Sequence, residues 1–199
     1  MSITENARMR GVVARARGLI LHPHVEWGVI DGESATIRGL YTSYVMILAA
    51  VPPVCGLIGG IVFGLGLGGH GMHASLVGLL VSAIIGYALS LGGVYVIGLI
   101  IEATAPYFGG TKDRMQAMKV AAFFPTAAWL AGIFRLVPAL AALEILGLYS
   151  LFILWLGLPR LMRVPEDKAL IYTLTVIVSA LVVMILISVI AGAAGTSLL

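Results

Sequence analysis

The stretch GLYTSYVMILAAVPPVCGLIGGIVFGLGLGGHGMHASLVGLLVSAIIGYALSLGGVYVIGLII (39–101) contains no Asp, Glu, Lys or Arg, and it decides the fold. A membrane-spanning helix needs roughly 20 apolar residues, so this stretch is too long for one span. The segment GGHGMH (68–73) interrupts it near the middle and has the composition of a turn. The sequence therefore predicts two membrane-spanning helices, over about 41–67 and 75–101.

Three further apolar segments, over 118–135, 138–158 and 169–194, complete the predicted fold. Hydrophobic residues make up 60% of the chain and charged residues 11%, with a mean hydropathy of +1.08. Soluble domains carry about a quarter charged residues, so this composition excludes a water-soluble fold. We predict an all-α polytopic membrane bundle of five transmembrane helices over residues 39–199, preceded by a cytoplasmic segment over 1–38 with an amphipathic interfacial helix.

The positions of the basic residues predict the orientation of the bundle. Lys and Arg concentrate in the cytoplasmic loops of membrane proteins. Of the twelve Lys and Arg residues, all but Arg135 precede the first span or lie between the second and third or the fourth and fifth spans. We therefore expect the N-terminus in the cytoplasm and the C-terminus on the outer side.

The N-terminal segment predicts an amphipathic helix over residues 8–21. A helical wheel gathers its apolar residues on one arc that arginines border on both sides. This pattern suits a helix in the membrane interface, with guanidinium groups on the phosphates of anionic lipids. Pro23 would end the helix, and a tryptophan would anchor the following segment in the interface. The candidate lipid-contacting residues are Arg8, Arg10, Arg15, Arg17 and Trp27. The alternative is a short helix that packs on the cytoplasmic face of the bundle.

Small residues in the first span predict a helix-packing face. Gly56, Gly60, Gly64 and Gly68 recur at four-residue intervals, a pattern that lets helix backbones approach closely in membranes. The face could serve packing within the bundle or between protomers, so a homo-oligomer is possible.

Charged residues near the spans are the candidates for intramembrane function, because ionisable groups in a bilayer are costly. Glu102 lies at the cytoplasmic end of the second span, and Glu144 lies inside the fourth. Arg135 precedes the fourth span and could reach Glu144. A structural ion pair between them is one interpretation, and a protonatable or ligand-binding Glu144 is the other.

Sequence motifs for catalysis, cofactors or nucleic acids are absent from the chain. We find no His-Glu-x-x-His, no Gly-x-Ser-x-Gly and no phosphate-binding glycine loop. His70 and His73, and the group of His22, His24 and Glu26, are weak metal-binding patterns because a further ligand is missing nearby. We expect no cofactor, no metal and no nucleic-acid partner.

Several motifs, in this order and spacing, resemble the bacterial branch of the Yip family, integral membrane proteins named as interactors of Ypt/Rab GTPases. They are Leu21-His22-Pro23 with Trp27, Phe108-Gly109-Gly110, Phe124-Pro125, Val137-Pro138 and Leu148-Tyr149-Ser150-Leu151. The resemblance implies a five-helix domain with a cytoplasmic N-terminus, and membrane-organising roles through protein partners. The Asp-Leu-Tyr-Gly-Pro signature of eukaryotic members is absent.

Two functions follow as hypotheses. The first is a non-enzymatic membrane-organising scaffold or adaptor in a bacterial inner membrane, with anionic lipids and an unidentified membrane or cytoplasmic protein as partners. The second is a small transporter or channel that uses Glu144 in a polar cavity. An intramembrane enzyme is a distant third.

Overall fold

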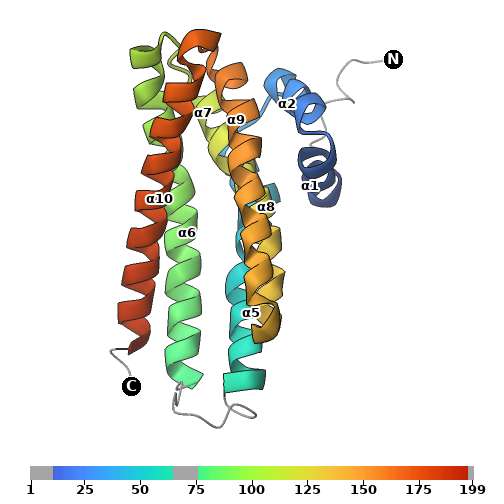
Figure 1. The fold of residues 1–199 in the computed structure, drawn as a ribbon, viewed down its shortest axis with the longest axis vertical. Helices are drawn as coiled ribbons and strands as arrows, with labels where there is room; N and C mark the ends of the chain where they lie inside the picture. The colour runs from blue at the N-terminus through green and yellow to red at the C-terminus, as the bar shows by residue number, and fades with distance from the viewer. Residues whose placement is uncertain (1–10, 65–75, 197–199) are drawn as a thin grey trace.

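The computed structural model describes residues 11–64 and 76–196, with side chains up to residue 190. The described residues are helical, without a strand, as the sequence predicted (Figure 1). In chain order the elements are α1 (Val12–Leu21), α2 (Pro23–Gly32), α3 (Ile37–Leu40), η2 (Tyr41–Val45), α4 (Met46–Ala49), α5 (Val51–Gly59), η3 (Gly60–Gly64), α6 (Leu76–Thr104), η4 (Ala105–Phe108), α7 (Arg114–Phe123), α8 (Thr126–Ala131), η5 (Gly132–Leu136), η6 (Pro138–Leu148), α9 (Tyr149–Met162) and α10 (Glu166–Thr196).

Among these residues, five continuous helical stretches are long and apolar enough to cross a membrane, which confirms the predicted number of spans. They cover Ile37–Phe63, Leu76–Phe108, Arg114–Leu136, Pro138–Met162 and Glu166–Ile190. The third is longer than the charge-free segment of the sequence because Asp113 caps its start, accepting a hydrogen bond from the backbone N–H of Gln116. Pro125 ends α7, and α8 resumes one residue later.

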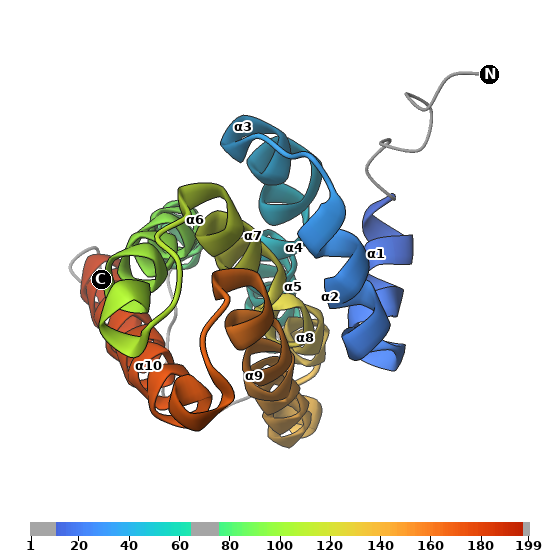
Figure 2. The same ribbon diagram turned by 90° about the horizontal axis from the view of Figure 1, so that it is seen from above.

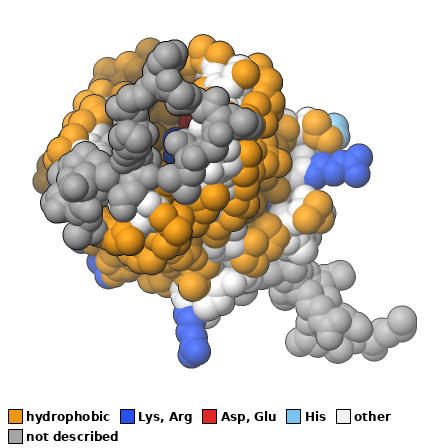
Figure 3. All heavy atoms as spheres, turned by 90° about the horizontal axis from the view of Figure 1, so that it is seen from below, with side chains coloured by type: hydrophobic (Ala, Val, Ile, Leu, Met, Phe, Trp, Pro, Cys, Tyr) orange, Lys and Arg blue, Asp and Glu red, His pale blue; other side chains and the backbone are white. Residues whose placement is uncertain are grey.

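The third span forms the centre of the bundle. Buried residues make up 72% of its most apolar window, against 17–28% in the other four spans. Small residues such as Ala117, Ala121 and Ala122 let neighbouring helices approach it closely. The outer spans instead expose Leu, Ile and Val side chains, as a surface solvated by lipid does. Seen from the C-terminal end, the described surface is almost entirely hydrophobic (Figure 3).

Helices α1 and α2 form an N-terminal hairpin that lies across the long axis of the bundle, beside one end of it (Figures 1 and 2). We call this end, which also holds η4 and the turn between α9 and α10, the hairpin end. Pro23 stops α1 and occupies the first turn of α2, where its missing N–H has no cost. Within Figure 1, α1 lies nearer the middle of the bundle than α2.

The predicted apolar arc of α1 does not face a single environment. Ala16 and Leu19 are buried against the protein, whereas Val13 is 81% exposed. One part of the expected arc therefore packs on the protein and another part faces outward. The contacts with the bundle, and not only the hydrophobic pattern, set the orientation of α1. Arg8 and Arg10 lie outside the described residues.

The glycines of the first span that the structure describes lie against η5 and α6. A Cβ on Gly59 would collide with the carbonyl oxygen of Arg135, so α5 and η5 touch through backbone at this point. A Cβ on Gly56 would meet only ordinary contacts, 3.7 Å from the Arg135 side chain, and one on Gly60 would lie 3.2 Å from Leu79. The surroundings of Gly64 are not described, and Gly68 lies outside the described residues.

Candidate functional site

A buried ion-pair cluster joins the two helices of the N-terminal hairpin and lies against α7 of the bundle. Arg15 of α1 is 1% exposed. Its guanidinium donates to Glu26 Oε1 of α2 at 2.6 Å and to Glu33 Oε2 beyond α2. It also lies 5.4 Å from the centroid of the Phe123 ring of α7. A buried charge is tolerated when it is paired and hydrogen-bonded. Arg15 therefore joins the hairpin to α7.

Lys119 of α7 holds the end of α2. It is 3% exposed, and its Nζ donates to the carbonyl oxygens of Ile30 at 2.9 Å and Glu33 at 2.6 Å. The last carbonyls of a helix have no partner within the helix, and a cation there also meets the negative end of the helix dipole. Asp31, in the same turn, pairs with Arg163 at 3.0 Å. The second helix of the hairpin is thus tied to two spans.

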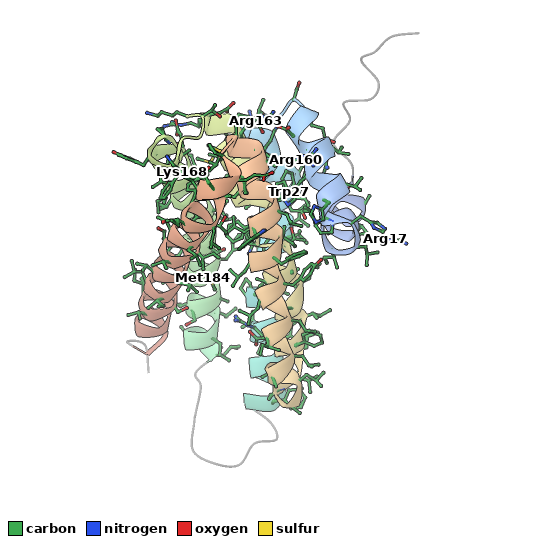
Figure 4. All side chains as sticks on the ribbon, turned by 45° about the horizontal axis from the view of Figure 1, so that its top comes forward. Arg17, Trp27, Arg160, Arg163, Lys168 and Met184 are labelled. Carbon is green, nitrogen blue, oxygen red and sulfur yellow. The ribbon has the colours of Figure 1, made fainter. Side chains whose placement is uncertain are left out.

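Trp27 is the main apolar contact of the hairpin. It is fully buried, and its Nε1 donates to the carbonyl oxygen of Ile153 at 2.9 Å. A Cβ on Gly157 would collide with the indole, so α9 has a notch that accepts the ring. Phe123 meets the indole edge-on, with ring centroids 6.5 Å apart. Figure 4 shows Trp27 between the hairpin and α9, with Arg17 pointing away from the bundle.

Two predicted lipid contacts are therefore corrected. Arg15 and Trp27 face the protein interior, because the carboxylates of the hairpin and the notch in α9 bind them more specifically than an interface would. For the inner side of α1, the structure agrees with the alternative interpretation, a short helix that packs on the bundle. Arg17 remains a candidate for lipid contact, because its side chain is exposed.

The cations of the described residues fall into two groups. One group is bound within the protein: Arg15, Arg114, Lys119, Arg135, Arg160 and Arg163. The other group is exposed and makes no ion pair or side-chain hydrogen bond in the described part of the chain: Arg17, Arg38, Lys112 and Lys168. The second group belongs to the hairpin end and to the segments that adjoin it. These four side chains are free to meet anionic groups outside the protein.

Both intramembrane carboxylates are paired. Glu102 is 8% exposed, and its Oε2 accepts a hydrogen bond from Arg114 Nε at 2.8 Å. Glu144 Oε2 accepts from Arg135 Nε at 3.1 Å and Nη2 at 3.0 Å. The Arg135 and Glu144 side chains are 48% and 35% exposed, so this pair joins η5 to η6 at an accessible position.

Metal-binding groups are not assembled in the part of the chain that the structure describes, where no cluster of three or more His, Cys, Asp or Glu side chains could hold an ion. Glu26, which the sequence places beside two histidines, is bound to Arg15 instead. His70 and His73 lie outside the described residues.

The sequence analysis did not predict the ion pairs that the acidic residues of the hairpin form. Three of the nine Asp and Glu residues, Glu26, Asp31 and Glu33, fall within eight positions directly after an arginine-rich segment. This clustering was the available signal, since opposite charges in adjoining segments favour a mutual pairing. Lys119 had no comparable signal, because its partners are backbone carbonyls.

The five spans and the docked hairpin define a small polytopic α-helical membrane protein. The family model of the Yip1 domain matches residues 17–187, and the chain belongs to this family. It is 30% identical over 158 residues to the proteins named "Inner membrane protein YohC" of Escherichia coli strain K12 and of Escherichia coli O6:H1 strain CFT073. The match covers 77% of this chain and 81% of each relative. No solved structure matches.

Proposed function

We propose that this protein is a non-enzymatic scaffold that organises the bacterial inner membrane, with its hairpin end in the cytoplasm and its C-terminus outside. The Yip1 domain match and the relatives named as inner membrane proteins support this proposal. The basic residues support the orientation, since those that adjoin the hairpin end outnumber those at the other end.

One observation carries the proposal: the hairpin is held rigidly beside one end of the bundle while its outward face stays apolar and cationic. Val13, Leu21 and Val25 are 81%, 55% and 68% exposed, and Arg17 is exposed beside them. Such a face suits the boundary between headgroups and acyl chains. The hairpin then enlarges the cross-section of the protein in the cytoplasmic leaflet alone, which favours curvature of the bilayer.

The four exposed cations add an electrostatic contact with the same leaflet. A basic residue near an anionic membrane surface contributes about 1 kcal/mol, and the contribution falls with salt. Arg17, Arg38, Lys112 and Lys168 would together hold the hairpin end against anionic headgroups. A cytoplasmic or membrane protein, or a second copy of this chain, would then be gathered at the curved surface.

The test is the shape of proteoliposomes that contain phosphatidylglycerol, observed by electron cryomicroscopy. The wild-type protein is expected to produce vesicles of smaller diameter as its density rises. The triple variant Val13→Asn, Leu21→Asn, Val25→Asn should lose this effect while it inserts normally. The control is Tyr107→Asn, which alters a side chain that is 83% exposed outside the hairpin. Equal vesicle diameters for wild type and triple variant would overturn the proposal.

A transporter or channel that uses Glu144 is the second candidate, favoured by the incomplete burial of its pair with Arg135. This candidate requires an ion or solute flux in proteoliposomes that Glu144→Gln changes and Glu102→Gln does not. Absence of flux in the wild-type protein would reject it.

A further inference from the structure

The hairpin carries an open groove on its outward side, with a volume of about 880 Å³. Ala14, Arg17 and Gly18 of α1 line one side, and Val25 and Glu26 of α2 line the other. Gly11, Val13 and His22 complete the lining. The groove thus combines apolar walls with a guanidinium, an imidazole and a carboxylate.

The charge in this groove is positive because of what lies beneath it. The network there contains three cations, the buried Arg15 and Lys119 and the exposed Arg163, and three anions, Glu26, Asp31 and Glu33. These charges balance, and Glu26, although it lines the groove, is bound to Arg15. Arg17 adds a charge that no described residue neutralises. An anion is therefore the ligand that the groove favours.

The surroundings of Arg17 indicate a lipid as the source of that anion. Val13 and Leu21 lie one helical turn before and after it on the same face of α1, and both are exposed. Val25 continues the apolar surface across the groove. A guanidinium within an apolar stripe suits a molecule that presents a phosphate and hydrocarbon together. A free phosphate would leave the apolar walls in water.

We propose that the groove binds one phospholipid with an anionic headgroup, such as phosphatidylglycerol. Arg17 and His22 donate hydrogen bonds to the headgroup, and the acyl chains follow Val13, Leu21 and Val25 toward the middle of the bundle. Gly18 lets the Glu26 side chain lie directly against α1 at the floor of the groove, because a Cβ there would collide with the Glu26 carboxylate. This inference rests on the proposed function in one respect, the placement of the hairpin in the interface.

Native mass spectrometry of the full chain in detergent tests this site with three probes: phosphatidylglycerol, phosphatidylcholine and inorganic phosphate. The wild-type protein is expected to retain one phosphatidylglycerol, and to retain phosphatidylcholine at least tenfold more weakly. Arg17→Gln should weaken the retention of phosphatidylglycerol about tenfold or more, since it removes a charge-assisted contact. The control Arg135→Gln removes an equal charge from a partly exposed cation of η5, outside the groove and outside the four cations of the hairpin end, and should change retention less than twofold.

A second variant fills the groove without changing its charge. Ala14→Trp places a large ring in the space for the lipid and should also weaken retention tenfold, with an unchanged melting temperature, because Ala14 is exposed. Equal effects of Arg17→Gln and Arg135→Gln, or full competition by inorganic phosphate, would overturn the lipid site. Loss of vesicle deformation with lipid retention intact would reject the scaffold alone, so the two failures are distinguishable.

Discussion

Replacing Arg15 by Met should loosen α1 from α2 and from α7. The substitution keeps an unbranched side chain of similar length but removes the guanidinium that bonds to Glu26 and Glu33. Breaking a buried ion pair by removing one partner costs about 3–5 kcal/mol, since the remaining charge stays desolvated. The contact with the Phe123 ring is lost as well. We expect most of this cost in the separation of α1 from α2, because Trp27 and Lys119 still hold α2 against the bundle.

Hydrogen–deuterium exchange of the α1 and α2 amides measures that separation directly. A loss of about 3 kcal/mol corresponds to exchange faster by about 100-fold, because each 1.4 kcal/mol is a factor of ten. Amides of α6 and α10 should exchange at the wild-type rate. The matched control is Arg17→Met, two positions along the same helix, measured without anionic lipid. Its side chain is exposed and unpaired in the described structure, so the change should stay within about 0.5 kcal/mol. Equal exchange in the two variants would refute the assignment of Arg15 as the docking residue.

Three further substitutions test the close contacts. Gly59→Ala should lower the free energy of unfolding in detergent by about 2 kcal/mol or more, because a Cβ meets a backbone carbonyl of η5. The control Gly56→Ala should be near neutral. Similar melting temperatures of the two variants would contradict this packing. Gly157→Ala should displace the indole of α2 and shift its fluorescence toward that of an exposed tryptophan, while Gly92→Ala, which meets nothing within 4 Å, should leave the spectrum unchanged. Lys119→Met should destabilise the protein by about 1–3 kcal/mol in chemical unfolding, since the carbonyl groups at the end of α2 lose their hydrogen-bond donor. A change below about 0.5 kcal/mol would argue against a stabilising role of Lys119 at the end of α2.

The central position of the third span could not be predicted from its own sequence. Its mean hydropathy of 1.5 is the lowest of the five spans, but this value does not specify which helices surround it. Burial among the other helices tolerates the lower hydropathy, because protein side chains replace lipid around this span. Arg114 at its start is tolerated for a similar reason, since it pairs with Glu102 of the second span.

Arg15 and Arg17 show where prediction from sequence stops. Both border the same predicted apolar arc, so a helical wheel gives them the same role. In the structure one is buried in an ion-pair cluster and the other is exposed beside the groove. The difference arises from the carboxylates of α2 and from α7, which lies roughly 100 positions later in the chain than α1.

The amino-acid sequence by itself determined that this chain spans a membrane with five helices. The length of each apolar segment and the positions of the charged residues are local properties, and they decide directly which segments fit the bilayer. Only the tertiary structure decided which charges are bound within the protein and which are exposed without a partner among the described residues. It also decided that Trp27 fills a notch in α9 and that Gly59 lies against the backbone of η5. These outcomes depend on which helix faces meet, and the energy of such contacts comes from residues far apart in the sequence.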